Sequence, residues 1–169
     1  MTVSMGIDLS LNSTGVVTLG PELYAETKIK PDARGVVRLT EIEADLKKEI
    51  ICYEPDIICL EDYSYASANQ SHQIGELGGV IRVLLHLLMV NWRVVSPAQV
   101  KKFATGKGNA SKVQVIKAVD KRWGIDTDSD DIADAFVLAK IGQALLGKEC
   151  QNQEQREVVE AIKKKGVVV

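Results

Sequence analysis

The apolar residues near the start of the chain follow the short runs of β-strands. Residues 4–10 and 15–20 each have the pattern of a strand, with the polar stretch LNST between them. A Gly-Pro turn at 20–21 leads into residues 22–30, whose alternation predicts a third strand. Because the connections are short, we expect the three strands to form an antiparallel meander.

The next segment changes to helical spacing. A helix over residues 34–53 is predicted by five side chains that recur every three or four positions: Leu39, Ile42, Leu46, Ile50 and Tyr53. Pro55 ends this helix. The nearly continuous apolar run 56–62 that follows is typical of a central strand covered on both faces.

A polar loop, YSYASANQSHQ, follows this strand and precedes a predicted helix over roughly residues 73–90. Residues 92–96 predict a fifth strand. Ser96-Pro97 then has the pattern of a helix start, with serine as the cap and proline in the first helical position.

Two longer helices are predicted after the glycine-containing loop TGKGNAS. Ser111 opens a basic helix that ends near Trp123-Gly124, and Ser129 opens a helix that fills residues 129–147. The polar tail 148–169 either continues as a helix or frays, so we place the folded domain in residues 1–147.

The predicted order βββ-α-β-α-β-α-α indicates a single α/β domain. A meander followed by alternating helices and strands implies a mixed sheet with helices on both faces. The crossover connections are expected to be right-handed.

The composition favours a cytoplasmic protein without a membrane segment. Of the 169 residues 46% are apolar and 26% are charged, and no apolar run approaches 18 residues. The start of the chain lacks the basic region and apolar stretch of a secretory signal. The three cysteines, Cys52, Cys59 and Cys150, lack metal or disulfide spacing and are interpreted as buried, reduced thiols.

The charge is unevenly distributed. The net charge is −2, but residues 97–124 hold seven basic residues and one acid, which gives 7 − 1 = +6 and leaves −8 for the rest of the chain. Such a segment can follow a phosphate backbone, although two solvated helix faces would give the same pattern. The charge pattern alone leaves both interpretations open.

Four acids stand out against the predicted elements. Asp8 interrupts the first strand and Glu61 ends the fourth, while Asp131 and Asp134 are three residues apart on one helix face. Each has an ordinary alternative: the helix acids can complement the helix dipole, Glu61 can begin a loop, and Asp8 can lie at a strand end. If the first and fourth strands are neighbours, however, all four carboxylates meet.

Four carboxylates in one place repel one another unless a cation lies among them. Oxygen ligands favour hard ions such as Mg²⁺ or Mn²⁺. A cluster of this kind could hold two metal ions about 4 Å apart, the arrangement that hydrolyses phosphodiesters.

In this order the motifs resemble the RuvC-type Holliday junction resolvases of the RNase H-like superfamily, in particular their phage-type members. The resemblance covers residues 1–147 and rests on GIDLSLNSTG, CLEDYS, QIGELGGVIR, SPAQVKKFATGKGNASK and DSDDIADAFVLA. It implies an RNase H-like fold with a five-stranded mixed sheet, a homodimer, and a cytoplasmic location, which is the host cytosol if a phage encodes the chain.

The resemblance also implies the activity and its residues. It implies paired nicks at four-way DNA junctions, with two Mg²⁺ ions per site that Mn²⁺ can replace. The metal-binding catalytic acids would be Asp8, Glu61, Asp131 and Asp134. Lys101 and Lys112 match basic residues near the scissile phosphate, with Lys112 also counted as catalytic and Lys102 and Lys107 as further DNA contacts.

Two segments carry further expectations. The loop after Glu61 departs from some bacterial members, which place a phenylalanine there, and Tyr63 or Tyr65 could stack on an unpaired base or simply pack within the loop. The helix over 73–90 contains Gly75, Gly78 and Gly79, so its apolar face could serve a dimer interface or the core.

Three alternatives to a strict resolvase remain. The nuclease could act on Y-junctions and other branched DNA more generally, or the chain could be a non-catalytic junction-binding module. GIDLSLNSTG also resembles the opening of sugar kinases and actin-like ATPases, but those enzymes need two such lobes and 169 residues are too few.

Overall fold

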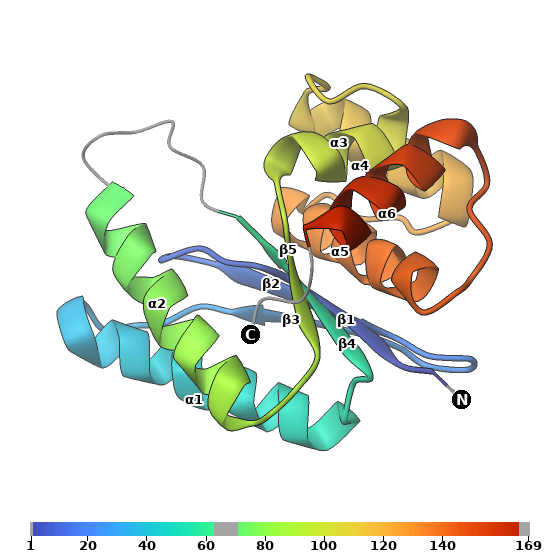
Figure 1. The fold of residues 1–169 in the computed structure, drawn as a ribbon. Coiled ribbons are helices and arrows are strands. Elements are labelled where there is room, and N and C mark those ends of the chain that lie inside the picture. The colour runs from blue at the N-terminus through green and yellow to red at the C-terminus, as the bar shows by residue number, and fades with distance from the viewer. Residues whose placement is uncertain (1, 63–70, 166–169) are drawn as a thin grey trace.

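The computed structural model describes residues 2–62 and 71–165 and contains a five-stranded mixed sheet between two helical layers (Figure 1). The strands are β1 (Ser4–Asp8), β2 (Thr14–Leu19), β3 (Tyr24–Ile29), β4 (Ile57–Glu61) and β5 (Trp92–Val95). Their order in the sheet is β3-β2-β1-β4-β5, with the first three antiparallel and the pairs β1–β4 and β4–β5 parallel. The predicted meander and the predicted neighbouring of the first and fourth strands are both confirmed.

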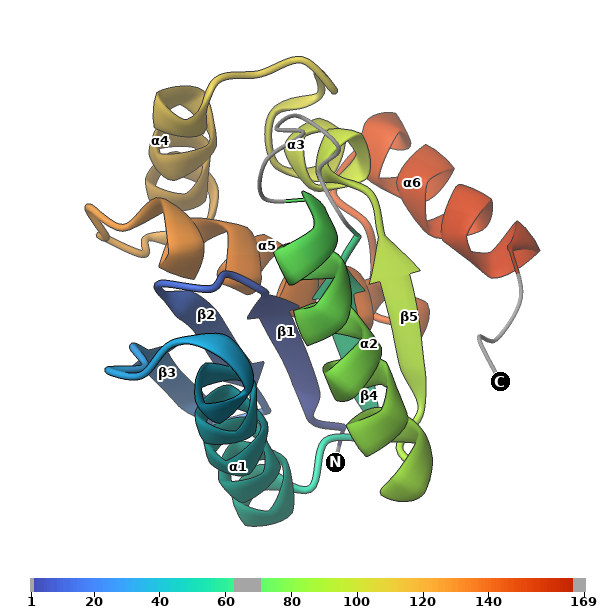
Figure 2. The same ribbon diagram turned by 90° about the vertical axis from the view of Figure 1, so that its left-hand side faces the viewer.

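The helices form a layer on each face of the sheet, as Figure 2 shows from the side. They are α1 (Gly35–Tyr53), α2 (Ser71–Leu87), α3 (Pro97–Thr105), α4 (Lys112–Trp123), α5 (Asp130–Leu145) and α6 (Gln153–Lys164). The helices α1 and α2 cover one face and α3 to α6 the other. The prediction of a mixed sheet with helices on both faces is therefore confirmed.

Side-chain alternation along the strands divides the core in two. On β1, Met5 and Ile7 pack with the aliphatic residues of α1 and α2. On β2 and β4, Val17 and Cys59 point to the other side and pack against α5. The helix α5 is buried along most of its length because it crosses the middle of the sheet and is covered by α3, α4 and α6.

The helix starts agree with the sequence patterns. Ser96 and Ser111 each form a capping box with the glutamine three residues later, and Ser129 caps α5. The predicted order, however, counted too few helices after β5. The helix α3 has only nine residues, and α6 has a polar composition that conceals its narrow apolar stripe of Val158, Val159 and Ile162.

Two predictions from composition can also be compared with the structure. Of the cysteines only Cys59 is buried, whereas Cys52 is exposed and Cys150 partly exposed, so the expectation of three buried thiols was wrong. The reason is that Cys52 lies on the solvent side of α1. Within residues 2–62 and 71–165, no helix has the length and apolar character needed to cross a membrane.

Candidate active site

The position of Asp8 follows from the alternation of side chains on β1. Ser4 and Gly6 point toward α5, where the Ser4 hydroxyl donates a hydrogen bond of 2.9 Å to the carbonyl of Ala139. Asp8 is the next residue of this row, so its carboxylate lies on the α5 side of the sheet.

Glu61 reaches the same place from the neighbouring strand. The parallel register pairs Ile7 with Leu60, so Asp8 and Glu61 follow side by side at the ends of β1 and β4. Glu61 shares its side of the strand with Cys59, which packs in the core beneath α5. The two side chains are joined by a hydrogen bond.

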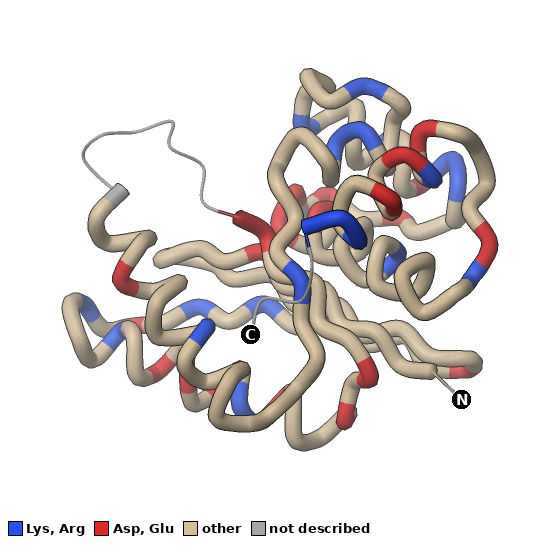
Figure 3. The backbone as a smooth tube through the Cα atoms, in the orientation of Figure 1, with Lys and Arg blue, Asp and Glu red and all other residues tan. Residues whose placement is uncertain are grey.

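Two glycines let α5 approach these strands closely. A Cβ at Gly6 would stand 2.0 Å from the carbonyl oxygen of Ala135, and one at Gly15 would stand 2.3 Å from that of Asp131. Any other residue at either position would push α5 off the sheet. This contact places the first turns of α5, with Asp131 and Asp134, over the strand ends, where acidic segments of β4 and α5 meet in Figure 3.

The electrostatics of the cluster are those of crowded, partly buried carboxylates. The pKa of Asp8 is raised well above its usual value, chiefly by burial and then by Glu61, Asp134 and Asp131. Burial also raises the pKa of Glu61, although its hydrogen bond with Asp8 works in the opposite direction. The pKa values of both carboxyl groups are therefore raised by their burial at the strand ends.

Asp134 belongs to the same electrostatic group. Burial and the charge of Glu61 raise its pKa to about 7, while Lys112 and Lys101 act to lower it. Carboxylates with pKa values raised in this way favour the uptake of either protons or a cation at neutral pH.

The two lysines predicted near a scissile phosphate both act on the acids. Lys101 on α3 and Lys112 at the start of α4 lower the pKa of Glu61 as well as that of Asp134. Lys112 is also joined to Asp130 by an ion pair and a hydrogen bond, and each partner stabilises the charged form of the other. The sequence reasoning missed Asp130, because its position before Asp131 resembles an ordinary acid in the first turn of a helix.

The other predicted DNA contacts lie outside this cluster or outside the described residues. The ammonium group of Lys102 forms an ion pair of 2.7 Å with Glu157 on α6. Lys107 is exposed in the loop between α3 and α4. Tyr63 and Tyr65 fall outside the described residues, and their proposed stacking remains a prediction.

The chemistry of the acidic cluster fits a hard divalent cation. All four candidate ligands are carboxylates, and the repulsion that raises the pKa of Asp8 is what a cation would relieve. Among the described residues no three Asp, Glu, His or Cys side chains already enclose an ion-sized position. Metal binding would therefore require the carboxylates to turn toward a shared ion.

The chain is similar to a known protein family along most of its length. The family described as "Crossover junction endodeoxyribonuclease RuvC" matches residues 5–141. The protein of that name from Rickettsia typhi is 32% identical to this chain over 81% of this chain and 94% of the relative. The one from Chloroherpeton thalassium is 30% identical over 83% of this chain and 81% of the relative.

Solved structures share the fold. Thermus thermophilus RuvC in complex with a Holliday junction substrate superposes with a TM-score of 0.71 and 21% identity over 82% of this chain and 91% of that chain. The yeast mitochondrial Holliday junction resolvase Ydc2 gives a TM-score of 0.61 and 14% identity over 96% of this chain and 83% of that chain. Fowlpox virus resolvase, solved with Holliday junction DNA, gives a TM-score of 0.59 and 18% identity over 87% of this chain and 100% of that chain. At these identities the superpositions establish the fold alone.

Proposed function

The chain belongs to the RuvC family of crossover junction endodeoxyribonucleases, and on that premise we propose that it resolves four-way DNA junctions by paired, metal-dependent nicks. The observation that carries the proposal is the gathering of Asp8, Glu61 and Asp134 between two lysines on one side of the sheet. A junction-binding module without catalysis would have no need of such a costly group of carboxylates.

The proposed metal ligands are the carboxylates of Asp8, Glu61, Asp131 and Asp134. Their oxygen chemistry suits two Mg²⁺ ions, which Mn²⁺ can replace. When bound, the ions supply an activated water and stabilise the leaving oxygen of the phosphodiester. Asp8 is central to the set because its pKa responds to all three of the other acids.

Lys101 and Lys112 supply positive charge beside the acids. Lys112 and Lys101 lie close enough to influence Glu61 and Asp134, so their ammonium groups can meet the oxygens of a phosphate held at the acids. Charge grows on those oxygens as the phosphodiester is attacked, and fixed cations stabilise it. For Lys112 this requires exchange of its bond with Asp130 for a bond with the phosphate.

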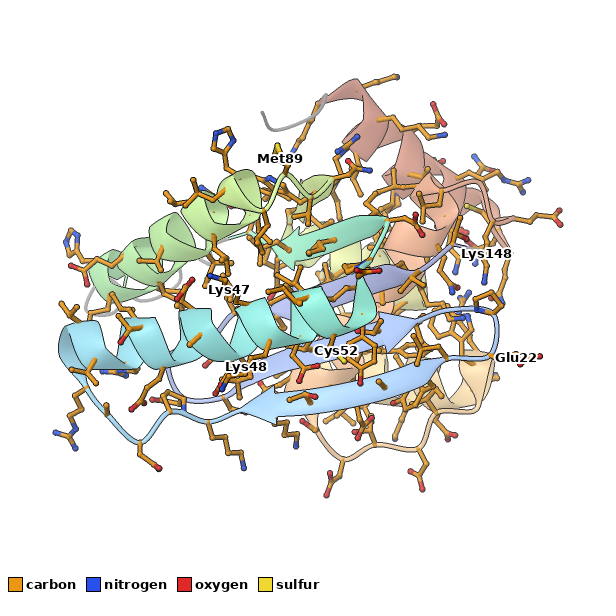
Figure 4. All side chains as sticks on the ribbon, turned by 90° about the horizontal axis from the view of Figure 1, so that it is seen from below. Glu22, Lys47, Lys48, Cys52, Met89 and Lys148 are labelled. Atoms are coloured by element: carbon orange, nitrogen blue, oxygen red, sulfur yellow. The ribbon has the colours of Figure 1, made fainter. Side chains whose placement is uncertain are left out.

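Paired nicks on two strands need two active sites, and we propose that a homodimer provides them. An apolar groove of about 730 Å³ runs between α1 and α2. Val36, Val83 and Leu87 line it and are 58–74% exposed. Figure 4 views this side of the molecule, with Met89 beyond the end of α2. A second copy that covers these side chains would remove them from water.

The glycines of α2 support this use of the helix. A Cβ at Gly75 or Gly79 would meet no heavy atom of the described residues within 4 Å, so packing within the chain does not demand glycine there. Glycine at such positions allows a neighbouring helix to approach closely, as an interface between two copies would need.

The decisive experiment is cleavage of a four-way junction with each arm labelled in turn. We expect symmetric nicks in two strands of like polarity with Mg²⁺ or Mn²⁺, and ends that carry a 5′-phosphate and a 3′-hydroxyl. A panel of Y-junctions, forks and linear duplex would define the range of substrates. A protein that binds junctions equally with and without metal and never cuts them would contradict the proposal.

A further inference from the structure

A basic cavity lies apart from the acids, between the loop that follows α3 and the outer side of α4. Its volume is about 490 Å³, large enough for a phosphate group and its neighbours. The residues that line it include Thr105, Lys107, Gln114, Ala118, Lys121 and Arg122. The lining therefore includes three cations, and none of its described residues is acidic.

The three cations that line the cavity differ from the other lysines of this region in their ion pairs. In the described part of the chain, no carboxylate forms an ion pair with Lys107, Lys121 or Arg122. The other lysines of this region differ, because Lys102 is paired with Glu157 and Lys112 with Asp130. Like charges that surround one cavity without a partner favour binding of an anion there.

The walls of the cavity are held in place by hydrogen bonds. Gly106 ends α3 in the left-handed conformation with φ of 85°, and its N–H donates to the carbonyl of Lys102 at 2.8 Å. The N–H of Lys107 donates to the Thr105 hydroxyl at 3.1 Å. On the facing side, the carbonyl oxygen of the Gln114 side chain accepts from the N–H of Ser111 at 2.8 Å, which leaves the amide N–H₂ of Gln114 as a donor.

The cavity and the catalytic lysine lie on different sides of α4. Lys112 and Lys121 are nine positions apart, which at 3.6 residues per turn is two and a half turns, so their side chains leave the helix in opposite directions. The axial separation is about 14 Å. A phosphate in this cavity is therefore a different phosphate from the one at the acids.

We propose that this cavity binds a backbone phosphate of the nucleic-acid substrate, several nucleotides from the scissile phosphate. The inference rests on the proposed function, because it assigns a second contact to the same substrate. The open mouth of the cavity and its place in the basic segment 97–124, which also carries Lys101 and Lys112, favour a polymer backbone over a small free anion.

The sharpest test compares two variants of nearly equal shape at Ala118. Ala118→Glu places a carboxylate among the cations, and Ala118→Gln places a neutral side chain of the same size. We expect Ala118→Glu to weaken junction binding by about 5- to 10-fold relative to Ala118→Gln, and to reduce the slope of log K against log salt by about 1. Binding is measured without metal, so no cutting is needed.

A matched pair at a distant site controls for net charge. Ala44 is exposed on α1, and Ala44→Glu is compared with Ala44→Gln in the same assay. We expect the two Ala44 variants to bind junctions alike. A difference as large as that at position 118 would overturn the proposal, because it would reflect net charge alone.

A second variant does not depend on filling the cavity. Lys121→Gln combined with Arg122→Gln changes side chains at the end of α4. The control is Lys28→Gln with Lys30→Gln, near the end of the edge strand β3 and directly after it. Junctions with one neutral methylphosphonate at successive positions locate the contact. We expect one position, distant from the cut, at which the neutral link weakens wild-type binding but not that of the Lys121/Arg122 variant.

Three further results would overturn the proposal. These are equal junction binding by the two Ala118 variants, no such position in the methylphosphonate series, and a cavity that binds inorganic phosphate while Ala118→Glu leaves DNA binding unchanged. Failure of the wild-type protein to cut junctions would instead contradict the proposed function, and the metal-free binding measurements would remain interpretable.

Discussion

The two helical layers of the sheet are packed in different ways. On one face α5 lies directly on β1 and β2, because Gly6 and Gly15 leave no side chain between the backbones. Burial and neighbouring acids raise the pKa values of Asp8 and Asp134 there, so this face carries repulsion that folding alone does not require. On the other face α1 and α2 pack through ordinary aliphatic side chains and leave apolar ones such as Leu87 exposed.

The two faces differ in what makes them unfavourable. The carboxylates of the acidic cluster repel one another, and the α1–α2 face leaves apolar side chains exposed to water. Electrostatic repulsion is relieved by an ion or a proton, whereas exposed apolar area is relieved by another protein surface. The first face therefore suits the proposed chemistry and the second the proposed assembly, and substitutions on one face should leave the function of the other intact.

The largest expected effect is on cutting by Asp8→Asn. Asp8 is the carboxylate on whose pKa all three other acids act, and its loss should slow junction cleavage by about 1,000-fold or more, because it removes the proposed central metal ligand. Gel-based cleavage with Mg²⁺ measures the rate, and junction binding and dimer content should be retained. Persistent paired nicks in Asp8→Asn would show that the acids are not the catalytic centre.

Lys112→Ala should have the next largest effect. Its ammonium group lies by the acids, so we expect the single-turnover rate to fall by about 10- to 100-fold while the dissociation constant for junctions changes by less than about 3-fold. Lys102→Ala is the matched control, because Lys102 is engaged with Glu157 on α6. Equal losses of rate and binding in Lys112→Ala would argue for a role in DNA binding only.

On the opposite face, Leu87→Lys should weaken association of two copies by about 10- to 100-fold, because it places a charge in the proposed apolar interface. Analytical ultracentrifugation over a range of concentrations measures the change. Ile51→Lys is the control, since Ile51 is also exposed on α1 but does not line the α1–α2 groove. Leu87→Lys should still nick junctions, but the nicks in the two strands should no longer occur together. An unchanged association constant would remove this face as the interface.

The smallest expected effect concerns stability without metal. The folded pKa of Asp134, about 7, lies above its ordinary value of 3.8, so this group favours folding below pH 4 and loses that contribution as the pH rises to 7. Asp134→Asn should therefore raise the melting temperature at pH 7.5 by about 2–8 °C, for a gain on the order of 1–2 kcal/mol. The difference should disappear near pH 4.

Asp130→Asn provides a control of opposite sign. Lys112 lowers the pKa of Asp130, so this carboxylate favours folding above its ordinary pKa and loses that contribution as the pH falls. The substitution should slightly lower the melting temperature at pH 7.5. A change of the same sign in Asp130→Asn and Asp134→Asn would contradict the electrostatic account of the cluster. Both melts are followed by circular dichroism in EDTA.

Much of the site was predictable because strand and helix periods are fixed by backbone geometry. A period of two places Asp8 on the same side as Gly6, and a spacing of three places Asp131 and Asp134 on one helix face. The serine caps before α3, α4 and α5 were also visible, because capping depends on only a few neighbouring residues.

Other features depend on contacts between distant segments. The bond between Lys112 and Asp130 joins residues 18 positions apart, and no local pattern indicates it. Gly6 looks like an ordinary weak point in a strand until α5 lies across it. The helix α6 was left open because its composition is polar, and its stability comes from burial of Val158, Val159 and Ile162 with α3 and α5.

The sequence by itself determined the order of the five strands, the faces on which the acids lie and the family to which the chain belongs, because these depend on local spacing and motif order. Only the tertiary structure decided which carboxylates have raised pKa values, which lysines form ion pairs with an acid, and which apolar side chains stay exposed. These properties arise from distances between segments far apart in the chain, and electrostatic and packing energies depend on those distances.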